Sequence, residues 1–519
     1  MKTGIVYLIG AGPGDPGLIT VKGLACLRKA EVVVYDYLAN PAFLREAPAG
    51  AERIYVGKRA GKHHRSQEEI NQLLVAKAGE GKIVARLKGG DPYIFGRGGE
   101  EALCLCQAGI PFEVVPGVTA GFAAAAYAGI PLSHRDYTTS LGLITGHEHP
   151  DKKMSSLDWN KLATGVGTLV FYMGMANLSL FARELMAHGR PENTPVAVIR
   201  WATTPKQRTL VGTLADVVDK VAAADLQPPA IIIVGEVVEL RRQLRWFETR
   251  PLFGKRILVT RTADQAGEFT SLLETQGAQV IECPTIRLVP DPDHSDLDAA
   301  VKGLASFDWL LLTSANAVRF FFDRMQAFGL DTRALGHCRI GAVGPKTAAA
   351  LRQHGIQPDL IPADYKGEGV VAAFAELNMV DKRVLFPHVD RAREVIPKGL
   401  AALGAEVIAP IAYCNQVPET LPPEALEALE AGDVDCITFT ASSTVENLAA
   451  ILGAERFSQL LQKIAVAAIG PITAKTCRQL GLEVAVEPEQ YTLEALIEAL
   501  VRYFAEKPSL ALLSEQTTP

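Results

Sequence analysis

The sequence predicts an α/β protein built from two unlike halves, and three observations support this fold class. In the first half, the β-branched runs Ile5–Ile9 and Val32–Tyr35 flank a helical pattern, which forms a β-loop-α-β unit. The second half repeats β-α modules, which predicts two similar doubly wound lobes. Between the halves, the charged stretch 241–255 contains Pro251 and Gly254 and precedes a new strand. The length of 519 residues fits three or four lobes.

Further strands of the first half are predicted where short apolar runs end in turn residues. They are Ile83–Leu87, Val114–Val115, Leu141–Thr145, Thr168–Met173, Val196–Arg200 and Ala230–Val234. The second half opens with a strand at Arg256–Val259 and contains internal echoes. FDWLLLTSANAV with IGAVGPKTAAAL resembles VDCITFTASSTV with IAAIGPITAKTC, and each strand end is followed by a helix start. Ligands bind at the carboxyl ends of such strands, so we expect the polar residues there to face a crevice.

Composition and charge exclude several classes of protein. With 48% hydrophobic residues and a net charge of −6, the chain is an ordinary globular protein and not a general nucleic-acid binder. The charge is uneven, +5 for residues 1–250 and −11 for 251–519. Eight cysteines without a CxxC pair predict reduced thiols, mostly buried, and the chain has no run of 18 apolar residues. We therefore expect a cytoplasmic protein without a membrane span.

The glycine loop 10–15 follows the first strand and invites a dinucleotide-binding interpretation, with Asp36 near the spacing of a ribose-binding acid. The match fails chemically, because Asp15 would repel a pyrophosphate and Pro13 and Pro16 lack N–H donors. Such a loop suits a neutral or cationic ligand, for example S-adenosylmethionine. Alternatively, the glycines only make a tight turn.

The ordered motifs of the first half resemble a known family. They are VYLIGAGPGD (6–15), the Tyr35-Asp36 strand end, RLKGGDPYIFGRGGEE (86–101), PGVTA (116–120), GIPLSHR (129–135), TGH (145–147), YMGM (172–175) and ATTPKQRTLVGTL (202–214). Together they look like uroporphyrinogen-III C-methyltransferase over about residues 3–245. The resemblance implies a tetrapyrrole-methylase fold, with two α/β subdomains and the active cleft between them, and a homodimer formed through this half.

The resemblance also implies site residues. Asp36 would be the proton acceptor and Lys58 the proton donor, and Arg97 and Arg135 are candidates for the carboxylates of the substrate. The implied S-adenosylmethionine contacts are Pro13, Gly89, Gly90, Asp91, Ile94, Thr119, Ala120, Met173 and Ala202, the last at a position where the family usually has glycine.

Simpler roles compete with these assignments. Asp36 could cap the next segment, and Lys58 could be a solvated surface charge. Arg97 and Arg135 could pair with the neighbouring acids Glu100, Glu101 or Asp136. The histidines at 63, 64, 147 and 149 lack a recognisable third or fourth ligand, so no metal is predicted.

The second half resembles uroporphyrinogen-III synthase over about residues 253–505, on LLLTSANAV (310–318), AVGPKTAAAL (342–351), the segment 384–415, ITFTASSTVENL (437–448) and AAIGPITAKTCRQLG (467–481). The resemblance implies a two-lobed doubly wound α/β fold that needs no cofactor. Tyr413 is the implied assistant of hydroxyl loss, and alternatively an aromatic packed at the lobe junction with a solvated hydroxyl. The implied substrate contacts are Ser314, Thr347, Ser443 and Thr473, although both serines could be helix N-caps. The local basic residues are Arg261, Arg391 and Arg393.

These resemblances predict a bifunctional enzyme of sirohaem or cobalamin synthesis. The second half would cyclise hydroxymethylbilane to uroporphyrinogen III with inversion of ring D, and the first would methylate it at C2 and C7 to give precorrin-2. The alternative is a methylase of a later corrinoid intermediate with a noncatalytic tetrapyrrole-binding module.

The predicted domains are 1–245, a linker 246–252, and 253–510 with lobes 253–287 plus 413–510 and 288–412, followed by a flexible tail 511–519. Because the linker has few apolar residues, we expect cleavage between Arg250 and Pro251 to yield two soluble fragments.

Overall fold

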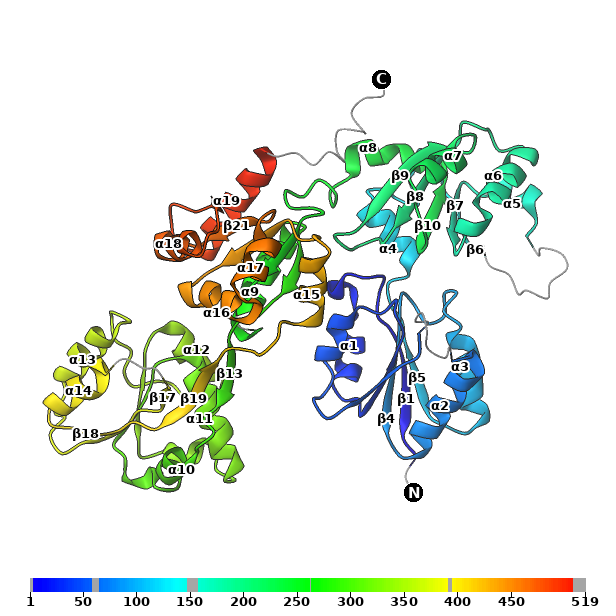
Figure 1. Cartoon of the computed structure of the whole chain (residues 1–519). Helices are drawn as coiled ribbons and strands as arrows, with labels where there is room; N and C mark the ends of the chain where they lie inside the picture. Colours follow the sequence, from blue (N-terminus) through cyan, green and yellow to red (C-terminus); the bar gives the residue numbers. More distant parts are fainter. Residues whose placement is uncertain (1–2, 58–64, 147–156, 262, 391–393, 507–519) are drawn as a thin grey trace. The chain divides into compact units, whose positions relative to one another are not determined.

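The computed structural model describes residues 3–57, 65–146, 157–261, 263–390 and 394–506 (Figure 1). By internal contacts the chain divides into two compact units. The first holds residues 1–257, 271–280 and 500–519, and the second holds 258–270 and 281–499.

The first α/β layer of unit 1 is a parallel sheet of order β3-β2-β4-β1-β5. Its residues alternate between two cores because successive strand side chains face opposite sides. Val6 and Val84 pack under α2 and α3, whereas Ile9 and Leu87 pack with α1 on the other face (Figure 1). The elements are β1 (Ile5–Gly10), α1 (Val21–Leu27), β2 (Val32–Tyr35), β3 (Glu52–Tyr55), α2 (Gln67–Gly79), β4 (Ile83–Lys88), α3 (Gly98–Gln107) and β5 (Phe112–Val115).

The second layer of unit 1 is a mixed sheet of order β6-β7-β10-β8-β9, in which only β6 and β7 run parallel. The alanine-rich helix α4 (Ala120–Tyr127) covers one face through Ala124 and Ala125, and three helices cover the other. The elements are β6 (Leu141–Thr145), α5 (Trp159–Gly165), β7 (Thr168–Tyr172), α6 (Leu178–Ala187), β8 (Pro195–Arg200), β9 (Arg208–Thr213), α7 (Val217–Ala223), β10 (Ala230–Val234) and α8 (Arg241–Leu244).

The segment predicted as a linker is packed into the fold. Phe247 is 3% exposed and Leu252 is 0% exposed. Trp246 Nε1 donates to the carbonyl of Ala126 at 2.9 Å, and the N–H of Leu252 donates to the carbonyl of Gln276 at 2.9 Å. The rings of Phe247 and Phe253 lie 5.3 Å apart across the bond between Arg250 and Pro251, so cleavage there would separate two packed rings, and the yield of two soluble fragments stays a prediction.

The second half contains two further parallel-sheet lobes that follow the sequence repeat. One has strand order β12-β11-β20-β21-β22 and the other β15-β14-β16-β18. The repeat places β14 beside β15 and β20 beside β21, each pair parallel. Three strands, β13 (Arg287–Pro290), β19 (Ile411–Gln416) and β17 (His388–Val389), form a small separate sheet.

The first of these lobes contains β11 (Arg256–Val259), α9 (Ala263–Thr275), β12 (Gln279–Glu282), α15 (Pro423–Glu430), β20 (Cys436–Phe439), α16 (Ser442–Leu452), α17 (Ala454–Leu461), β21 (Ala465–Ala468), α18 (Pro471–Gln479), β22 (Val484–Val486) and α19 (Leu493–Glu506). The other contains α10 (Ser295–Lys302), β14 (Trp309–Leu312), α11 (Ala315–Ala327), β15 (Arg339–Ala342), α12 (Pro345–Gln353), α13 (Gly367–Ala375), β16 (Arg383–Leu385), α14 (Val395–Ala402) and β18 (Glu406–Ile408).

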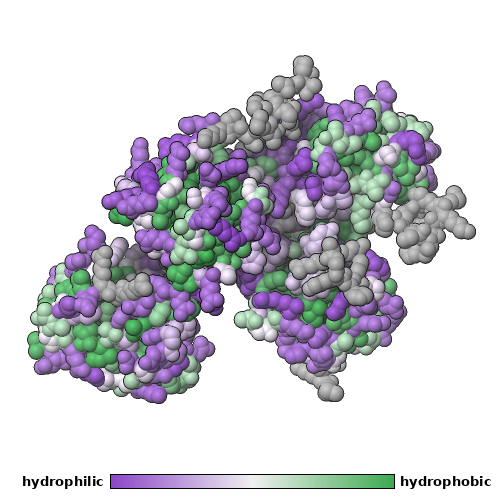
Figure 2. All heavy atoms as spheres, viewed as in Figure 1, coloured by the Kyte–Doolittle hydropathy of each residue, from purple (hydrophilic) through white to green (hydrophobic). Residues whose placement is uncertain are grey.

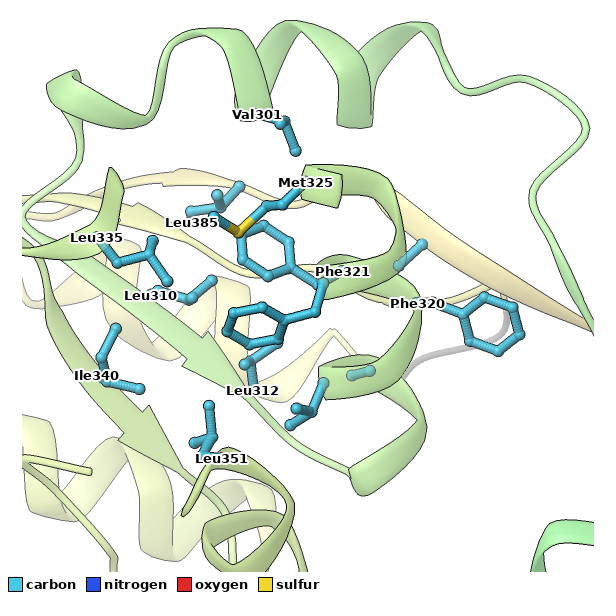
Figure 3. Packing of buried hydrophobic residues seen from close by; sticks show 14 of the residues in the cluster. Val301, Leu310, Leu312, Phe320, Phe321, Met325, Leu335, Ile340, Leu351 and Leu385 are labelled. Carbon is cyan, nitrogen blue, oxygen red and sulfur yellow. The ribbon is translucent and has the colours of Figure 1, made fainter. Parts of the chain in front are cut away.

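In the lobe with strand order β15-β14-β16-β18, the buried core around α11 orients Phe320. Phe321 and Met325 of α11 pack among Leu310, Leu312 and their neighbours (Figure 3). Phe320 lies apart from them in the same view. Adjacent helix positions diverge by about 100°, so the ring of Phe320 projects away from that of Phe321, although both belong to one buried cluster that also includes Tyr413.

The surface hydropathy and the burial of the cysteines are those of an ordinary globular protein. Hydrophilic residues are spread over the face shown in Figure 2, with hydrophobic ones between them. None of the described helices is long and apolar enough to cross a membrane. All eight cysteines are free, and five are buried, namely Cys26, Cys283, Cys338, Cys436 and Cys477.

Candidate functional sites

Three loops at the carboxyl ends of β1, β4 and β5 meet at very close range in unit 1. A Cβ on Gly117 would lie 2.4 Å from the carbonyl oxygen of Gly90 and 2.6 Å from the Cα of Gly10. Gly12 and Gly90 exchange two backbone hydrogen bonds, of 3.2 and 2.7 Å. Only glycine permits this approach, so the three glycine clusters of the sequence form one backbone platform.

Asp91 ties two of these loops together. Its carboxylate accepts from the N–H of Tyr93 at 2.8 Å and from the N–H of Gly117 at 3.0 Å. The residue as a whole is half-buried. Asp91 therefore fixes the loops as well as offering a negative charge beside them.

The apolar residues predicted to contact a cofactor lie around one hydrophobic cluster. Ile94, Ala120 and Ala202 all pack against the core that contains Tyr172. The hydroxyl of Tyr172 lies 2.9 Å from that of Thr119 and accepts from the N–H of Gly121 at 3.0 Å. Residues from three separate motifs thus share one surface.

Backbone strain concentrates at the same place. Four non-glycine residues with positive φ lie in the candidate motifs, Phe95 (53°), Arg97 (58°), Met173 (53°) and Thr203 (67°), and Trp201 (48°) directly precedes the last of these motifs. Such conformations cost free energy and persist where the surrounding structure imposes them, often at functional sites.

Asp36 lies at the end of β2 within a buried network of charges. Its carboxylate accepts from the N–H of Leu38 at 3.1 Å and pairs with Arg86 at 3.2 Å. Arg86 also pairs at 3.2 Å with Glu101, which is 0% exposed, and Glu101 pairs with Lys88 at 2.9 Å. Burial and the charge of Arg86 lower the pKa of Lys88, against the opposing effect of Glu101. The two cations and two carboxylates compensate one another, as buried charges require.

Sequence reasoning named Asp36 but missed the rest of this network. The signal was present in the motif RLKGGDPYIFGRGGEE, where Arg86 and Lys88 stand inside an otherwise apolar strand. Both are buried, and a buried charge on a strand needs a partner.

The other predicted residues of the first half take varied places. Arg97 is exposed and makes the predicted ion pair with Glu100, at 2.7 Å. Arg135 is exposed in the loop between α4 and β6, and Pro13 is half-buried in the glycine loop. A Cβ on Gly89 would lie 2.6 Å from the Cβ of Leu38, which brings the cofactor motif next to the Asp36 segment. Lys58 and the histidine pairs at 63–64 and 147–149 lie outside the described residues.

In the second half, Tyr413 on β19 is held by its ring and its hydroxyl. Its ring stacks on Phe320 with centroids 5.0 Å apart and an interplanar angle of 10°. Its hydroxyl lies 3.2 Å from the hydroxyl of Ser314, which caps α11 by accepting from the N–H of Ala317 at 3.0 Å. Tyr413 is 7% exposed, so its hydroxyl is bonded rather than simply solvated.

The remaining predicted hydroxyls differ in accessibility. The hydroxyl of buried Thr347 donates to the carbonyl of Val343 at 3.0 Å, and Thr473 is also buried. Ser443 is exposed in the first turn of α16 and is not its N-cap. Its neighbour Ser442 accepts a hydrogen bond from Thr476 at 2.8 Å, so the polar network uses the serine before the predicted one.

Two exposed tyrosines were missed by sequence reasoning. The ring of Tyr365 lies beside Gly344 and that of Tyr491 beside Gly470, the glycines that precede α12 and α18. Each tyrosine follows its glycine by 21 residues, so the internal repeat could have revealed the pair.

Burial lowers the pKa of Arg261 at the end of β11, and Arg391 and Arg393 lie outside the described residues.

Comparison with known proteins gives two family matches. A family model described as tetrapyrrole (corrin/porphyrin) methylases matches residues 5–218, and one described as uroporphyrinogen-III synthase HemD matches residues 267–498. Porphyrin biosynthesis protein HemD of Ruminiclostridium josui is 38% identical over 96% of this chain and 98% of its own length. Uroporphyrinogen-III C-methyltransferase of Priestia megaterium is 53% identical over 45% of this chain and 98% of its own length.

Two solved structures are also similar to parts of this chain. The uroporphyrin-III C-methyl transferase of Thermus thermophilus, complexed with S-adenyl homocysteine, is 40% identical over 46% of this chain and all of its own, with a TM-score of 0.39. A mutant uroporphyrinogen III synthase of the same organism is 23% identical over 49% of this chain and all of its own, with a TM-score of 0.34.

Proposed function

This chain belongs to the tetrapyrrole methylase and uroporphyrinogen-III synthase families, joined in one polypeptide, and from that premise we propose that its second half makes the substrate that its first half methylates. It is a bifunctional enzyme of tetrapyrrole biosynthesis, and both resemblances in the sequence are confirmed. The α/β fold class predicted from the sequence is confirmed as well.

We propose two consecutive reactions. The synthase half closes hydroxymethylbilane into uroporphyrinogen III, with inversion of ring D and loss of water. The methyltransferase half then methylates this octacarboxylate at C2 and C7 to give precorrin-2. The observation that carries the second step is the convergence of Gly10, Gly90 and Gly117 beside the half-buried carboxylate of Asp91.

The residues around the three loops fit S-adenosylmethionine. The close glycine approach leaves bare backbone, Ile94 and Ala202 supply apolar surface, and Asp91 supplies negative charge for a cationic ligand. We assign it to Pro13, Gly89, Gly90, Asp91, Ile94, Thr119, Ala120, Met173 and Ala202. When bound, it supplies an electrophilic methyl group on a sulfonium.

Asp36 is proposed to accept the proton that the methylated carbon must lose. Two features support this role. The cation of Arg86 pairs with the carboxylate, and the N–H of Leu38 orients one of its oxygens. A base held in this way is pre-positioned, which is worth roughly 10²–10⁴-fold in proton transfer. For the donor role of Lys58 the support is the resemblance.

In the synthase half we propose that Tyr413 assists loss of the hydroxyl group, with Ser314 as its hydrogen-bond partner. Helices α11, α12, α16 and α18 start just after strands β14, β15, β20 and β21. The N–H groups at the N-termini of these helices suit the carboxylates of the substrate. The net negative charge of this half does not prevent such binding, because charges more than about 8 Å away are largely screened by salt. Tyr365 and Tyr491 offer exposed rings to the pyrroles.

The test is incubation of the full chain with hydroxymethylbilane, with and without S-adenosylmethionine. Without the methyl donor we expect isomer III in excess of the spontaneous isomer I, and with it a dimethylated product. Isomer I alone would leave the second half as a noncatalytic binding module. Isomer III that is never methylated would favour a later corrinoid substrate for the first half.

The finer assignments rest on the same resemblance. We propose domains 1–245 and 253–510. We also propose a homodimer that forms through the methyltransferase half, and sedimentation of the full chain and of its variants tests this oligomeric state. The boundary proposed here lies within residues 219–266, which neither family model matches.

A further inference from the structure

The turn at 201–204 is held in a strained form beside the glycine loop. Trp201 and Thr203 have φ of 48° and 67°, which side chains rarely adopt. The turn touches the loop directly, because the N–H of Asp15 donates to the hydroxyl of Thr203 at 3.0 Å. A Cβ on Gly14 would lie 3.2 Å from the carbonyl oxygen of Ala202. A shift of the turn would therefore move Ala202, which is part of the turn, and would disturb the glycine loop.

Gln207 fixes this turn from within. It is 3% exposed, and its Oε1 accepts from the N–H of Thr203 at 2.9 Å. Its Nε2 donates to the carbonyl of Tyr127 at 3.3 Å and to Glu248 Oε1 at 2.7 Å. The amide thus connects the strained Thr203 to the carboxylate of Glu248, which lies 41 positions beyond Gln207 in the chain.

Glu248 is anchored on its other side. Its Oε2 pairs with Arg241, which is 5% exposed and donates to the carbonyl of Ala128 at 2.7 Å. Its Oε1 also accepts from the hydroxyl of Thr209 at 2.5 Å. Glu248 lies in the segment that neither family model covers, yet its contacts are with the first half.

We propose that Glu248 is a positioning residue for the S-adenosylmethionine site: through Gln207 it holds the backbone of the 201–204 turn against the glycine loop. The proposal rests on the methyl-donor site proposed above. It gives the junction between the two halves a role in cofactor binding.

The test measures binding of S-adenosylhomocysteine to the full chain by titration calorimetry. Glu248→Ala removes the acceptor, and Glu248→Asp retains a charge for Arg241 but withdraws the carboxylate by one methylene. We expect each to raise the dissociation constant about tenfold or more. Gln207→Ala should do the same, and the double variant Glu248→Ala with Gln207→Ala should be no weaker than the weaker single variant, because both act through one link.

Two controls separate positioning from general stability. Thr209→Val removes a hydrogen bond to Glu248 that does not lead to the turn, so its melting temperature should fall while its affinity stays within about twofold. Glu239→Ala breaks an exposed ion pair with Arg242 and should change neither.

The melting transition reports whether each variant is folded, and synthase turnover reports whether the second half is intact. Folded Glu248→Ala or Glu248→Asp protein with wild-type affinity would overturn the proposal, as would strictly additive losses in the double variant. Failure of the wild-type chain to bind S-adenosylhomocysteine would instead refute the methyl-donor site itself. If Glu248→Ala does not fold, Glu248→Asp decides.

Discussion

Replacing Gly117 by alanine tests whether the close approach of three strand ends controls cofactor affinity. The added Cβ would lie 2.4 Å from the carbonyl oxygen of Gly90 and 2.6 Å from the Cα of Gly10. Nonbonded contacts are optimal at about 3.5 Å, so these strand ends must separate by about 1 Å. Gly117 does not need positive φ, so the whole cost is steric.

The size of the effect follows from that displacement. Overpacking of this kind costs about 1–3 kcal/mol of folding free energy. A misplacement of about 1 Å can cost about 10²-fold in catalytic rate, and we take this as the upper end of the expected loss of affinity. We expect the shift also to disturb the hydrogen bond from the N–H of Gly117 to Asp91 Oδ2, which is 3.0 Å long. We expect the dissociation constant for S-adenosylhomocysteine to rise about 10–100-fold, equivalent to about 1.4–2.7 kcal/mol.

The assay is titration calorimetry on the full chain, with synthase turnover as the measure of an intact second half. The matched control is Gly99→Ala, because Gly99 is exposed in α3 and a Cβ there meets nothing within 4 Å. This control should bind normally and gain up to about 1 kcal/mol of stability from helix propensity. Folded Gly117→Ala protein with unchanged affinity would refute the reasoning.

Three further predictions concern the two reactions and the thiols. Asp36→Asn should leave cofactor binding unchanged and slow methylation by about 10²-fold or more in single-turnover kinetics; near-normal turnover would reduce Asp36 to a structural role. Tyr413→Phe keeps the ring that stacks on Phe320 and should slow formation of isomer III by about 10²-fold, with only the small fall in melting temperature that loss of the hydrogen bond to Ser314 causes, whereas an unchanged rate would remove the hydroxyl from the mechanism. Burial raises the pKa of Cys477 to about 11, so at pH 8 only about one thiol in 10³ is ionised, and iodoacetamide should label exposed Cys106 first; mass spectrometry showing early labelling of Cys477 would contradict its burial.

Strands and helix starts could be predicted from the sequence where the signal is local. The run Leu141–Thr145 was placed as the structure has it, because an apolar segment bounded by turn residues specifies its own conformation. The strands Glu52–Tyr55 and Arg208–Thr213 were missed. Both are polar at their ends and lie at sheet edges, where the pattern is weak.

The sequence by itself determined the α/β class, the repeat of the second half, the families and the glycine motifs, because each depends on residues that are neighbours in the chain. Only the tertiary structure decided how Asp36 joins Arg86, and how Glu248 reaches Gln207, since these partners are 50 and 41 positions apart. It also decided that the junction is packed, because a few apolar residues in a charged segment do not reveal what covers them. Which distant residues pair depends on how the strands and turns assemble. The local pattern of a single sequence does not specify this assembly, because it results from all the contacts of the fold together.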